Sequence, residues 1–374
     1  MSAPVMFQRL DTESGHQIGI ATLNSERSLN ALSLAMVQSL SEQLAHWAAD
    51  PQIVAVWLQG AGEKAFCAGG DIRAIYDSQR SHAGELDQQV TDFFTQEYQL
   101  DYQLHRYPKP LLVWGSGIVM GGGLGLMAGA DFRLVTETSR IAMPEISIGL
   151  FPDVGGSYFL NRMPGHCGRF LGLTAYNMNG ADACYVGLGD HLLASADKAA
   201  VLEVLTQLPW QQDKAADKQQ LTERLLCFSE RAAEAMPPSI LAINQPLIDE
   251  LMAGELTEVM TRLGHTHSDE QWLQRAINTA QAGSPITACL LWQQLALGRE
   301  WSLEQVFQQE LIWAVRCAQL GDFVEGVRAL LIDKDRSPKW QFSGIEQVPA
   351  GFIEQLTESP WPQHPLQGLK ESAL

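Results

Sequence analysis

Hydrophobic and polar positions in the first half of the chain follow a pattern that predicts strands and helices in alternation. Residues 16–23 (HQIGIATL) and 53–58 (IVAVWL) have the pattern of strands. Between them, residues 35–48 place apolar side chains on one helical face. A second unit begins with a strand at 111–114 and returns, after a glycine-rich turn and a helix, to a strand at 132–135. Strands that alternate with helices in this way favour an α/β fold.

The pattern changes after about Ala194, where the strand-like alternation stops and apolar residues recur at helical spacing. Leu221 and Leu225 share one such helical face, and further apolar faces follow towards the C-terminus. These faces are typical of a core or of subunit contacts rather than of a cofactor site. Because no proline- or serine-rich linker interrupts the chain, we expect two closely packed regions, a core over residues 1–195 and a mostly helical C-terminal region over residues 196–374.

The composition limits the class of protein. Of the 374 residues, 46% are apolar and only 18% are charged, which suits a compact globular protein. Asp and Glu outnumber Lys and Arg by 43 to 25, so the formal net charge is −18. Such a charge repels a phosphate backbone. We therefore expect no nucleic-acid partner.

The cysteines and the N-terminal segment indicate the compartment. The six cysteines are scattered, without a CxxC pair or a close Cys/His set, which indicates reduced thiols and no metal site. The opening MSAPVMFQRLDTESG lacks the basic-then-apolar order of a signal peptide and the Arg-rich character of a transit peptide. Both observations favour a cytoplasmic protein.

An uncharged stretch at residues 110–130 is long enough to cross a bilayer, but its composition argues against a membrane helix. Seven of its positions are glycine, which is typical of turns rather than of a continuous helix. We therefore expect no membrane association.

Two glycine-rich turns are candidates for chemistry. The segment KAFCAGGDIR at residues 64–73 ends a short apolar run, and MGGGLG at residues 120–125 leads into the predicted helix. If the turns converge, one backbone N–H from each would stabilise an oxygen that gains negative charge. Taken singly, each turn is equally typical of an ordinary strand-to-helix connection. A dinucleotide site is disfavoured, because Gly123, Gly125 and Gly129 give the spacing GxGxxxG.

Two carboxylates stand in an otherwise apolar segment, MPEISIGLFPDVGG at residues 143–156. Apolar surroundings raise the pKa of a carboxyl group, so Glu145 and Asp153 are candidates for acid–base chemistry or for attack on a carbonyl. The residues alone also allow a second interpretation, in which each carboxylate caps a helix or pairs with an arginine such as Arg162 or Arg169.

Other motifs are weaker. His265 and His267 lie two residues apart without a third metal ligand at suitable spacing, which is typical of a solvated loop. The chain contains no GxSxG motif, and none of its cysteines stands in a reactive motif, so a serine or cysteine hydrolase is disfavoured.

Four segments taken together resemble the crotonase (enoyl-CoA hydratase/isomerase) superfamily. They are SLNALS at 28–33, KAFCAGGDI at 64–72, MGGGLGL at 120–126 and MPEISIGLFPDVGG at 143–156. The resemblance implies an α/β spiral of β-β-α units, with residues 1–195 as the core that binds an acyl-CoA. It also implies an oxyanion hole formed by the N–H groups of Gly70 and Gly122.

Within the superfamily the chain resembles the hydrolases of short 3-hydroxyacyl-CoA thioesters. Gly125 stands where the hydratases carry a catalytic glutamate, whereas Glu145 matches the glutamate that both groups share. Asp153 matches an acidic residue typical of the hydrolases, and Glu97 in FFTQEYQL matches a substrate-contacting glutamate. A further match covers residues 325–340. The implied substrate is 3-hydroxyisobutyryl-CoA, an intermediate of valine breakdown.

The resemblance implies a role for each of these residues. Glu145 would attack the thioester carbonyl or activate a water, while Asp153 and Glu97 would orient the 3-hydroxyl group and the water. CoA is part of the substrate, and no separate cofactor or metal is expected. The implied CoA contacts are Arg27, Leu29, Ala68, Asp71, Ile72 and Lys334.

Two alternatives remain open at this point: an enoyl-CoA hydratase or isomerase, and a non-catalytic protein that binds acyl-CoA. A methyl group separates 3-hydroxyisobutyryl from 3-hydroxypropionyl, a difference worth only about 1–3 kcal/mol in a pocket, so the sequence leaves the acyl group open. It equally allows a monomer and a small homo-oligomer.

Overall fold

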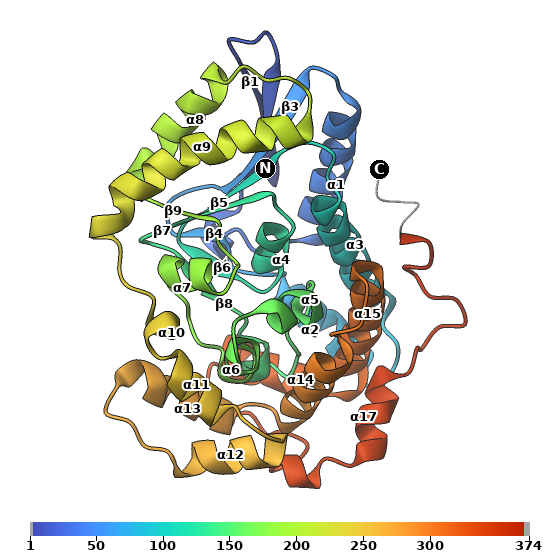
Figure 1. The fold of residues 1–374 in the computed structure, drawn as a ribbon. Coiled ribbons are helices and arrows are strands. Elements are labelled where there is room, and N and C mark those ends of the chain that lie inside the picture. The colour runs from blue at the N-terminus through green and yellow to red at the C-terminus, as the bar shows by residue number, and fades with distance from the viewer. Residues whose placement is uncertain (1–2, 370–374) are drawn as a thin grey trace.

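Two β-sheets carry the first half of the chain in the computed structural model, which describes residues 3–369 (Figure 1). The larger sheet has the strand order β1-β2-β3-β5-β7-β9, in which only β1 and β2 are antiparallel neighbours. The smaller sheet, β4-β6-β8, is parallel. The strands are β1 (Val5–Asp11), β2 (Gln17–Leu23), β3 (Ile53–Gly60), β4 (Ala65–Cys67), β5 (Leu111–Gly115), β6 (Ile118–Met120), β7 (Phe132–Thr136), β8 (Arg140–Ala142) and β9 (His191–Leu193).

The strands follow a repeating path. The chain places β3 in the larger sheet and β4 in the smaller one, then does the same with β5 and β6 and with β7 and β8. Helices follow each pair, so the predicted α/β spiral of β-β-α units is confirmed. The helices of this half are α1 (Leu34–Ala49), α2 (Ile72–Ser81), α3 (Gln88–His105), α4 (Gly122–Ala128), α5 (Gly156–Phe159), α6 (Cys167–Thr174) and α7 (Gly180–Tyr185).

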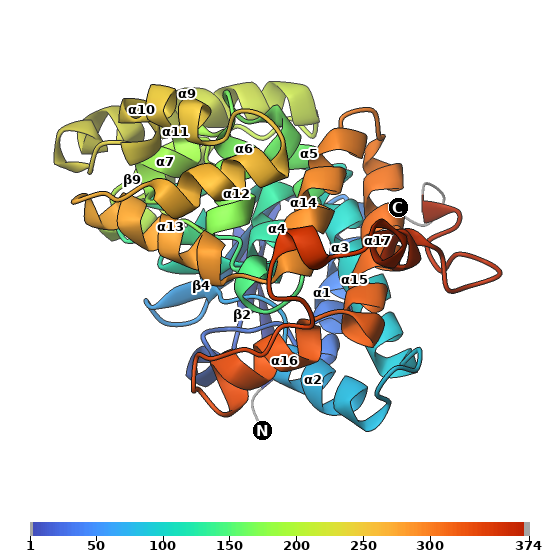
Figure 2. The same ribbon diagram turned by 90° about the horizontal axis from the view of Figure 1, so that it is seen from below.

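The second half is helical in its described part, as predicted. Figure 1 shows α8 and α9 at one end of the molecule and α11, α12 and α13 at the other, and Figure 2 shows α16 beside α2, which it contacts. The helices are α8 (Lys198–Gln207), α9 (Lys214–Ala232), α10 (Ile240–Ile243), α11 (Gln245–Leu251), α12 (Leu256–His265), α13 (Gln271–Ala282), α14 (Pro285–Leu297), α15 (Leu303–Leu320), α16 (Phe323–Val327) and α17 (Ala350–Thr357).

The predicted elements agree with the observed ones except near the second glycine-rich turn. The sequence predicts a helix after the glycine-rich run at residues 120–125, but the helix begins inside this run, at Gly122. Glycine is required there because an added Cβ atom on Gly122 would collide with the Glu97 carboxyl, and one on Gly123 would collide with the backbone of Cys67. The uncharged stretch at residues 110–130 forms β5, β6 and α4. Within residues 3–369, no helix combines the length and the apolar character needed to span a bilayer.

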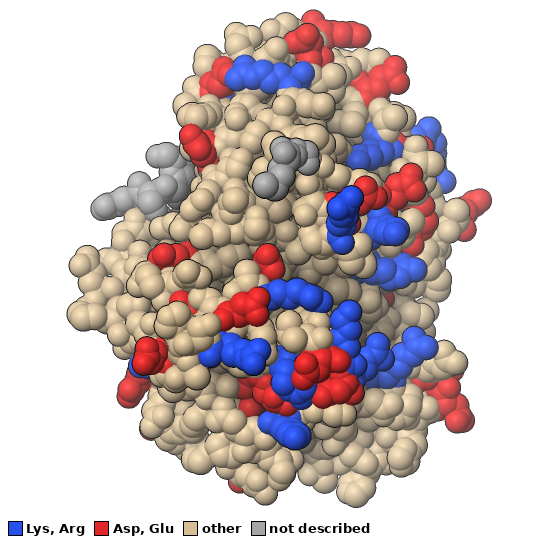
Figure 3. All heavy atoms as spheres, turned by 180° about the vertical axis from the view of Figure 1, so that it is seen from behind, with Lys and Arg blue, Asp and Glu red and all other residues tan. Residues whose placement is uncertain are grey.

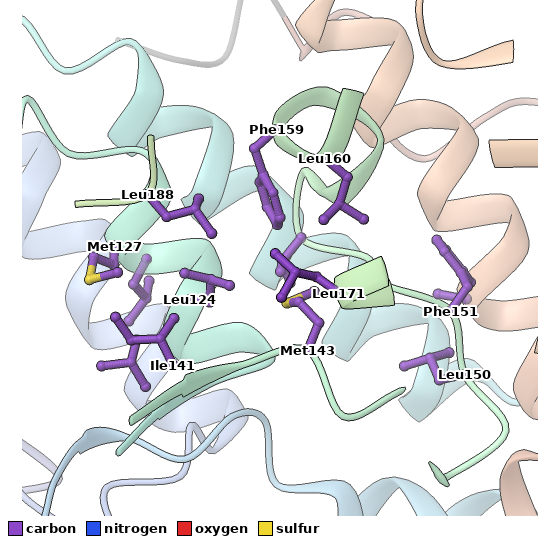
Figure 4. Packing of buried hydrophobic residues seen from close by; sticks show 14 of the residues in the cluster. Leu124, Met127, Ile141, Met143, Leu150, Phe151, Phe159, Leu160, Leu171 and Leu188 are labelled. Carbon is purple, nitrogen blue, oxygen red and sulfur yellow. The ribbon is translucent and has the colours of Figure 1, made fainter. Parts of the chain in front are cut away.

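The two halves share two hydrophobic clusters, one on each side of the larger sheet. Apolar residues of α8 and α9 cover one face of the larger sheet, whereas α1 packs on its other face. Figure 4 shows the core beneath the smaller sheet, where Leu124 and Met127 of α4 lie near Ile141 and Met143. The predicted boundary at residue 195 stays a prediction.

Helix α15 ties the C-terminal region to α3. Phe307 is fully buried, and its ring lies 6.0 Å from that of Tyr98, 6.2 Å from that of Tyr102 and 6.1 Å from that of His105, measured between centroids. These edge and tilted contacts stabilise both helices beyond the area that they bury.

We expect Phe307→Ala to lower the free energy of unfolding by about 3–5 kcal/mol, because it removes a buried ring and leaves a cavity between α3 and α15. Urea unfolding followed by circular dichroism measures this change. Leu226→Ala is the control, since Leu226 is 49% exposed and its loss should cost less than about 0.5 kcal/mol. Equal effects of the two substitutions would contradict the account of the shared core.

Candidate active site

The two glycine-rich turns meet at the same edge of the smaller sheet. They follow β4 and β6, which are parallel neighbours, so their carboxyl ends lie side by side. Gly69 and Gly121 take φ values of +109° and +47°, a region that favours glycine, and each turns the chain just before Gly70 or Gly122. An added Cβ atom on Gly122 would lie 3.4 Å from the nitrogen of Gly70, so the two amides are close.

Neither of these amides has a partner within the described chain. For residues 3–369, no hydrogen bond joins the N–H of Gly70 or of Gly122 to another protein group. The Gly122 amide also opens the first turn of α4, where backbone N–H groups are left unpaired. Two free N–H groups side by side can both donate a hydrogen bond to one negatively charged oxygen.

The backbone before α1 runs beside the first turn. The Ala68 amide donates to the Leu29 carbonyl at 3.0 Å, and the Asp71 amide donates to the Leu32 carbonyl at 2.8 Å. Helix α2 starts immediately afterwards at Ile72. The structure therefore brings together Leu29, Ala68, Asp71 and Ile72, four of the residues predicted to contact CoA.

The other two predicted CoA contacts lie on the surface. Arg27 is exposed in the short 3-10 helix Glu26–Ser28, directly before Leu29. Lys334 is exposed on a turn near α2, since the guanidinium of Arg73 in α2 donates to the Leu331 carbonyl at 2.9 Å. That both residues bind CoA stays a prediction.

A small pocket of about 60 Å³ opens at the paired turns. It is bounded by both turns, by α3 and by the segment after β8. Three carboxyl groups face it, those of Glu97, Glu145 and Asp153, and each residue is 2–3% exposed. The lining residues are Ala68, Gly69, Gly70, Ile72, Phe93, Phe94, Glu97, Gly121, Gly122, Pro144, Glu145, Ile148, Leu150 and Asp153.

Glu145 points at the second turn. It starts the 3-10 helix Glu145–Ser147, and an added Cβ atom on Gly121 would lie 3.2 Å from its Oε1. Its Oε2 is buried and has no hydrogen-bond partner within the described residues. Burial therefore raises the pKa of Glu145 well above its ordinary value, with further contributions from the charges of Asp153 and Glu97. In its ionised form, a carboxyl group without a partner is available as a base or a nucleophile.

Asp153 is held in place by a tyrosine. The Tyr98 hydroxyl on α3 donates to Oδ2 of Asp153 at 2.5 Å. Burial raises the pKa of Asp153 to about 6, while this hydrogen bond opposes the rise. Burial likewise raises the pKa of Glu97 well above its ordinary value, and the Asp153 charge adds to the effect. Asp153 is thus the carboxyl of this set that ionises near neutral pH.

The C-terminal region holds the loop that carries Asp153. Glu310 on α15 accepts from the Gly155 amide at 2.7 Å and from the Ser157 amide at 2.8 Å. Gln294 on α14 donates to the Pro152 carbonyl at 2.5 Å and to the Ser157 hydroxyl at 2.9 Å. The loop is therefore fixed on both sides of Asp153 by helices from the second half of the chain.

The alternative of arginine pairing for the two carboxylates is not observed. Arg162 stacks on the Tyr158 ring, and Arg169 donates to the Met252 carbonyl at 2.8 Å. No ion pair found among residues 3–369 involves Glu145 or Asp153. In the same range, no group of three or more His, Cys, Asp or Glu side chains is arranged to hold a metal ion.

Sequence reasoning missed four residues of this site: Tyr98, Asp101, Gln294 and Glu310. Tyr98 and Asp101 follow Glu97 on α3 and share its buried face. The sequence did offer a signal, because a polar residue on the buried face of a helix is unusual. Gln294 and Glu310 gave a similar signal on α14 and α15, but nothing in their spacing links them to Asp153.

Comparisons with known proteins agree on one family. The family model described as enoyl-CoA hydratase/isomerase matches residues 18–357. The mitochondrial 3-hydroxyisobutyryl-CoA hydrolase of Danio rerio is 39% identical over 357 residues, which cover 95% of this chain and 89% of the relative. The enzyme of that name from Homo sapiens is 37% identical over 336 residues, covering 88% and 83%.

Solved structures with the same fold carry other names. A crystal structure of an enoyl-CoA hydratase from Rhodobacter sphaeroides 2.4.1 has a TM-score of 0.81 at 32% identity and covers 96% of this chain and 98% of its own. A carnitinyl-CoA dehydratase from Mycobacterium thermoresistibile has a TM-score of 0.80 at 31% identity, with coverage of 97% and 98%.

We expect Asp153→Asn to stabilise the protein at alkaline pH and not at acid pH. The pKa of Asp153 is raised from 3.8 to about 6, so the folded state favours the protonated form and loses stability as the pH rises through 6. The neutral amide avoids this loss. The expected gain in the free energy of unfolding is about 2–3 kcal/mol at pH 8 and close to zero at pH 4.

Urea unfolding at the two pH values measures this difference. Asp77→Asn, at an exposed position of α2, is the matched control and should show no comparable pH dependence. An Asp153→Asn protein that is less stable than the wild type at pH 8 would mean that the Asp153 charge is well solvated or paired.

Proposed function

The chain belongs to the enoyl-CoA hydratase/isomerase family, and on that premise we propose that it hydrolyses a short 3-hydroxyacyl-CoA thioester, 3-hydroxyisobutyryl-CoA above others, to the 3-hydroxy acid and free CoA. The observation that carries the proposal is one pocket that combines two free backbone amides with Glu145 and Asp153. The similarity to the 3-hydroxyisobutyryl-CoA hydrolases over most of the chain supports the same substrate class.

The two amides and Glu145 would act on the same carbonyl group. The thioester oxygen accepts hydrogen bonds from the N–H groups of Gly70 and Gly122, and these bonds polarise the carbonyl. Glu145 then attacks the carbonyl carbon, or removes a proton from a water that attacks it. In either route negative charge grows on the oxygen between the amides, the carbon–sulfur bond breaks, and the CoA thiolate leaves. If Glu145 activates the water, the proton that it removes goes to the thiolate. If Glu145 attacks the carbonyl, a water then cleaves the resulting anhydride, which releases the 3-hydroxy acid, restores Glu145 and supplies the proton for the thiolate. The amides therefore stabilise the transition state more than the substrate.

Asp153 and Glu97 would recognise the 3-hydroxyl group. Both carboxyls line the pocket, Glu97 lies next to Gly122, and Tyr98 fixes the orientation of Asp153. A hydroxyl group placed there can donate to an ionised Asp153, and a site built around such a bond discriminates against acyl groups that lack the hydroxyl. The small volume of the pocket favours a short acyl group.

The CoA moiety would run along the surface from Leu29 and Ala68 towards Asp71, Ile72 and Lys334, with Arg27 close to the turn. A net charge of −18 does not prevent this, because the basic residues Arg27, Arg73 and Lys334 are exposed beside this path. Figure 3 shows Lys and Arg in a loose band, mixed with Asp and Glu, across the rear face. We further propose a cytoplasmic location, which the six scattered cysteines, all within the described residues and without a disulfide, support.

An enoyl-CoA hydratase is the second candidate, because the solved structure from Rhodobacter sphaeroides bears that name. The surroundings of Gly125 speak against it. An added Cβ atom on Gly125 would lie 2.6 Å from Cβ of Val154 and 2.9 Å from Oδ2 of Asp101, so the site of the expected second glutamate is filled. Hydration of a double bond would have to proceed without that carboxylate.

The test of the proposed function is the release of free CoA thiol, followed with a thiol-reactive dye. We expect the wild type to release thiol rapidly from 3-hydroxyisobutyryl-CoA and not from crotonyl-CoA. Glu145→Gln keeps the shape of the side chain but removes the base or nucleophile, and it should lower kcat by about 10²–10⁴.

Glu346→Gln, a substitution at a surface glutamate, is the matched control and should leave kcat unchanged. A blank without substrate accounts for the six cysteines of the protein. Loss of the enoyl absorbance of crotonyl-CoA without thiol release would favour the hydratase. Binding of both esters without any turnover would favour a non-catalytic acyl-CoA-binding protein.

A further inference from the structure

Asp101 is a buried carboxyl group that the proposed mechanism does not use. It lies one helical turn beyond Glu97 on α3 and is 0% exposed. Neither of its oxygens has a hydrogen-bond partner within the described residues. Burying a polar group without a partner costs free energy, so its presence beside the pocket requires an explanation.

The carboxyl group of Asp101 fills the space between α4 and the loop that carries Asp153. An added Cβ atom on Gly125 would lie 2.9 Å and 3.0 Å from the two oxygens of Asp101, and 2.6 Å from Cβ of Val154. Asp101 therefore packs on Gly125 and beside the residue that follows Asp153. The absence of a side chain at Gly125 is what makes room for it.

The titratable groups around Asp101 are mostly acidic. Glu97 and His105 share its helix, Asp153 stands on the loop, Glu310 comes from α15, and Cys67 comes from β4. Helix α4 contributes no titratable side chain, because its sequence is GGLGLMA. His105 does not supply a positive charge, since burial lowers its pKa to about 4. No cation found within residues 3–369 forms an ion pair with Asp101.

A carboxyl group in these surroundings keeps its proton. Burial raises the pKa of Asp101 well above its ordinary value, and the charges of Glu97, Asp153 and Glu310 raise it further. An ionised Asp101 would have neither a donor nor a cation to stabilise it. Asp101 therefore stays neutral, while Asp153, whose pKa is about 6, carries negative charge at neutral pH.

We propose that Asp101 is a positioning residue that acts as a neutral carboxylic acid: it supports the Asp153 loop against Gly125 and leaves the negative charge of the cluster to Asp153. The role rests on the proposed hydrolysis. A second negative charge at Asp101 would oppose the charge that grows on the thioester oxygen, so the reaction stops when Asp101 loses its proton at alkaline pH.

Infrared spectroscopy tests the protonation directly, without a need for activity. A buried protonated carboxyl has a C=O stretch apart from that of carboxylates, and the stretch shifts in D₂O. We expect the wild type to show this band at pH 8 and Asp101→Asn to lack it. Labelling with ¹³C-aspartate separates the bands of Asp from those of Glu. Whether the wild type shows an Asp band at pH 8 can be measured even if the variant does not fold. An absent Asp band at pH 8 in the wild type overturns the proposal.

The pH dependence of kcat tests the role in the reaction. We expect wild-type kcat to fall at alkaline pH by about tenfold per pH unit as one group ionises, and Asp101→Asn to keep its neutral-pH value over the same range. Asp92→Asn, on the same helix, is the matched control and should follow the wild type.

Two outcomes would overturn the role of Asp101. One is an identical alkaline profile for the wild type and Asp101→Asn. The other is a loss of kcat of about 10² or more at neutral pH in a folded Asp101→Asn protein, which would mean that an ionised Asp101 is needed. If the wild type hydrolyses no acyl-CoA, the proposed function fails, while the infrared result still decides whether Asp101 is protonated.

Discussion

The burial of several carboxyl groups beside two unpaired backbone amides is the constraint on which the rest of the structure depends. Charged groups of one sign repel each other in a region that excludes water, so the fold must supply donors or leave some of the groups protonated. Around the pocket the amides of Gly70 and Gly122 are the free donors that face Glu145. We expect an anionic oxygen that forms during the reaction to accept hydrogen bonds from both amides.

The C-terminal half of the chain is part of this arrangement. Glu310 and Gln294 reach from α15 and α14 to the backbone on either side of Asp153, and Phe307 packs α15 against α3. The loop that carries Asp153 is therefore held by residues more than a hundred positions away in the sequence. The strands of the described chain lie before residue 195, but the loop that carries Asp153 is held by helices that come after it.

Much of the fold could be predicted from the sequence, because strand and helix periods are local signals. The turns at Gly70 and Gly122 and the carboxylates Glu145 and Asp153 were also visible, since glycine runs and acids within apolar segments are unusual. Glu97 was identified as a candidate site residue only through the resemblance to the family. The contact of Tyr98 with Asp153 spans 55 residues, so no local pattern reveals it. The same holds for Glu310, whose partners become apparent only once α15 is packed.

A crystal structure of the Glu145→Gln variant with bound 3-hydroxyisobutyryl-CoA tests the central claim most directly, because it shows whether one pocket holds the thioester and recognises the hydroxyl group. The account predicts that the thioester oxygen lies about 3 Å from the nitrogens of both Gly70 and Gly122, with the 3-hydroxyl group hydrogen-bonded to Asp153 or Glu97. A thioester oxygen bound away from the two amides, or an acyl group that points away from Asp153, would contradict it.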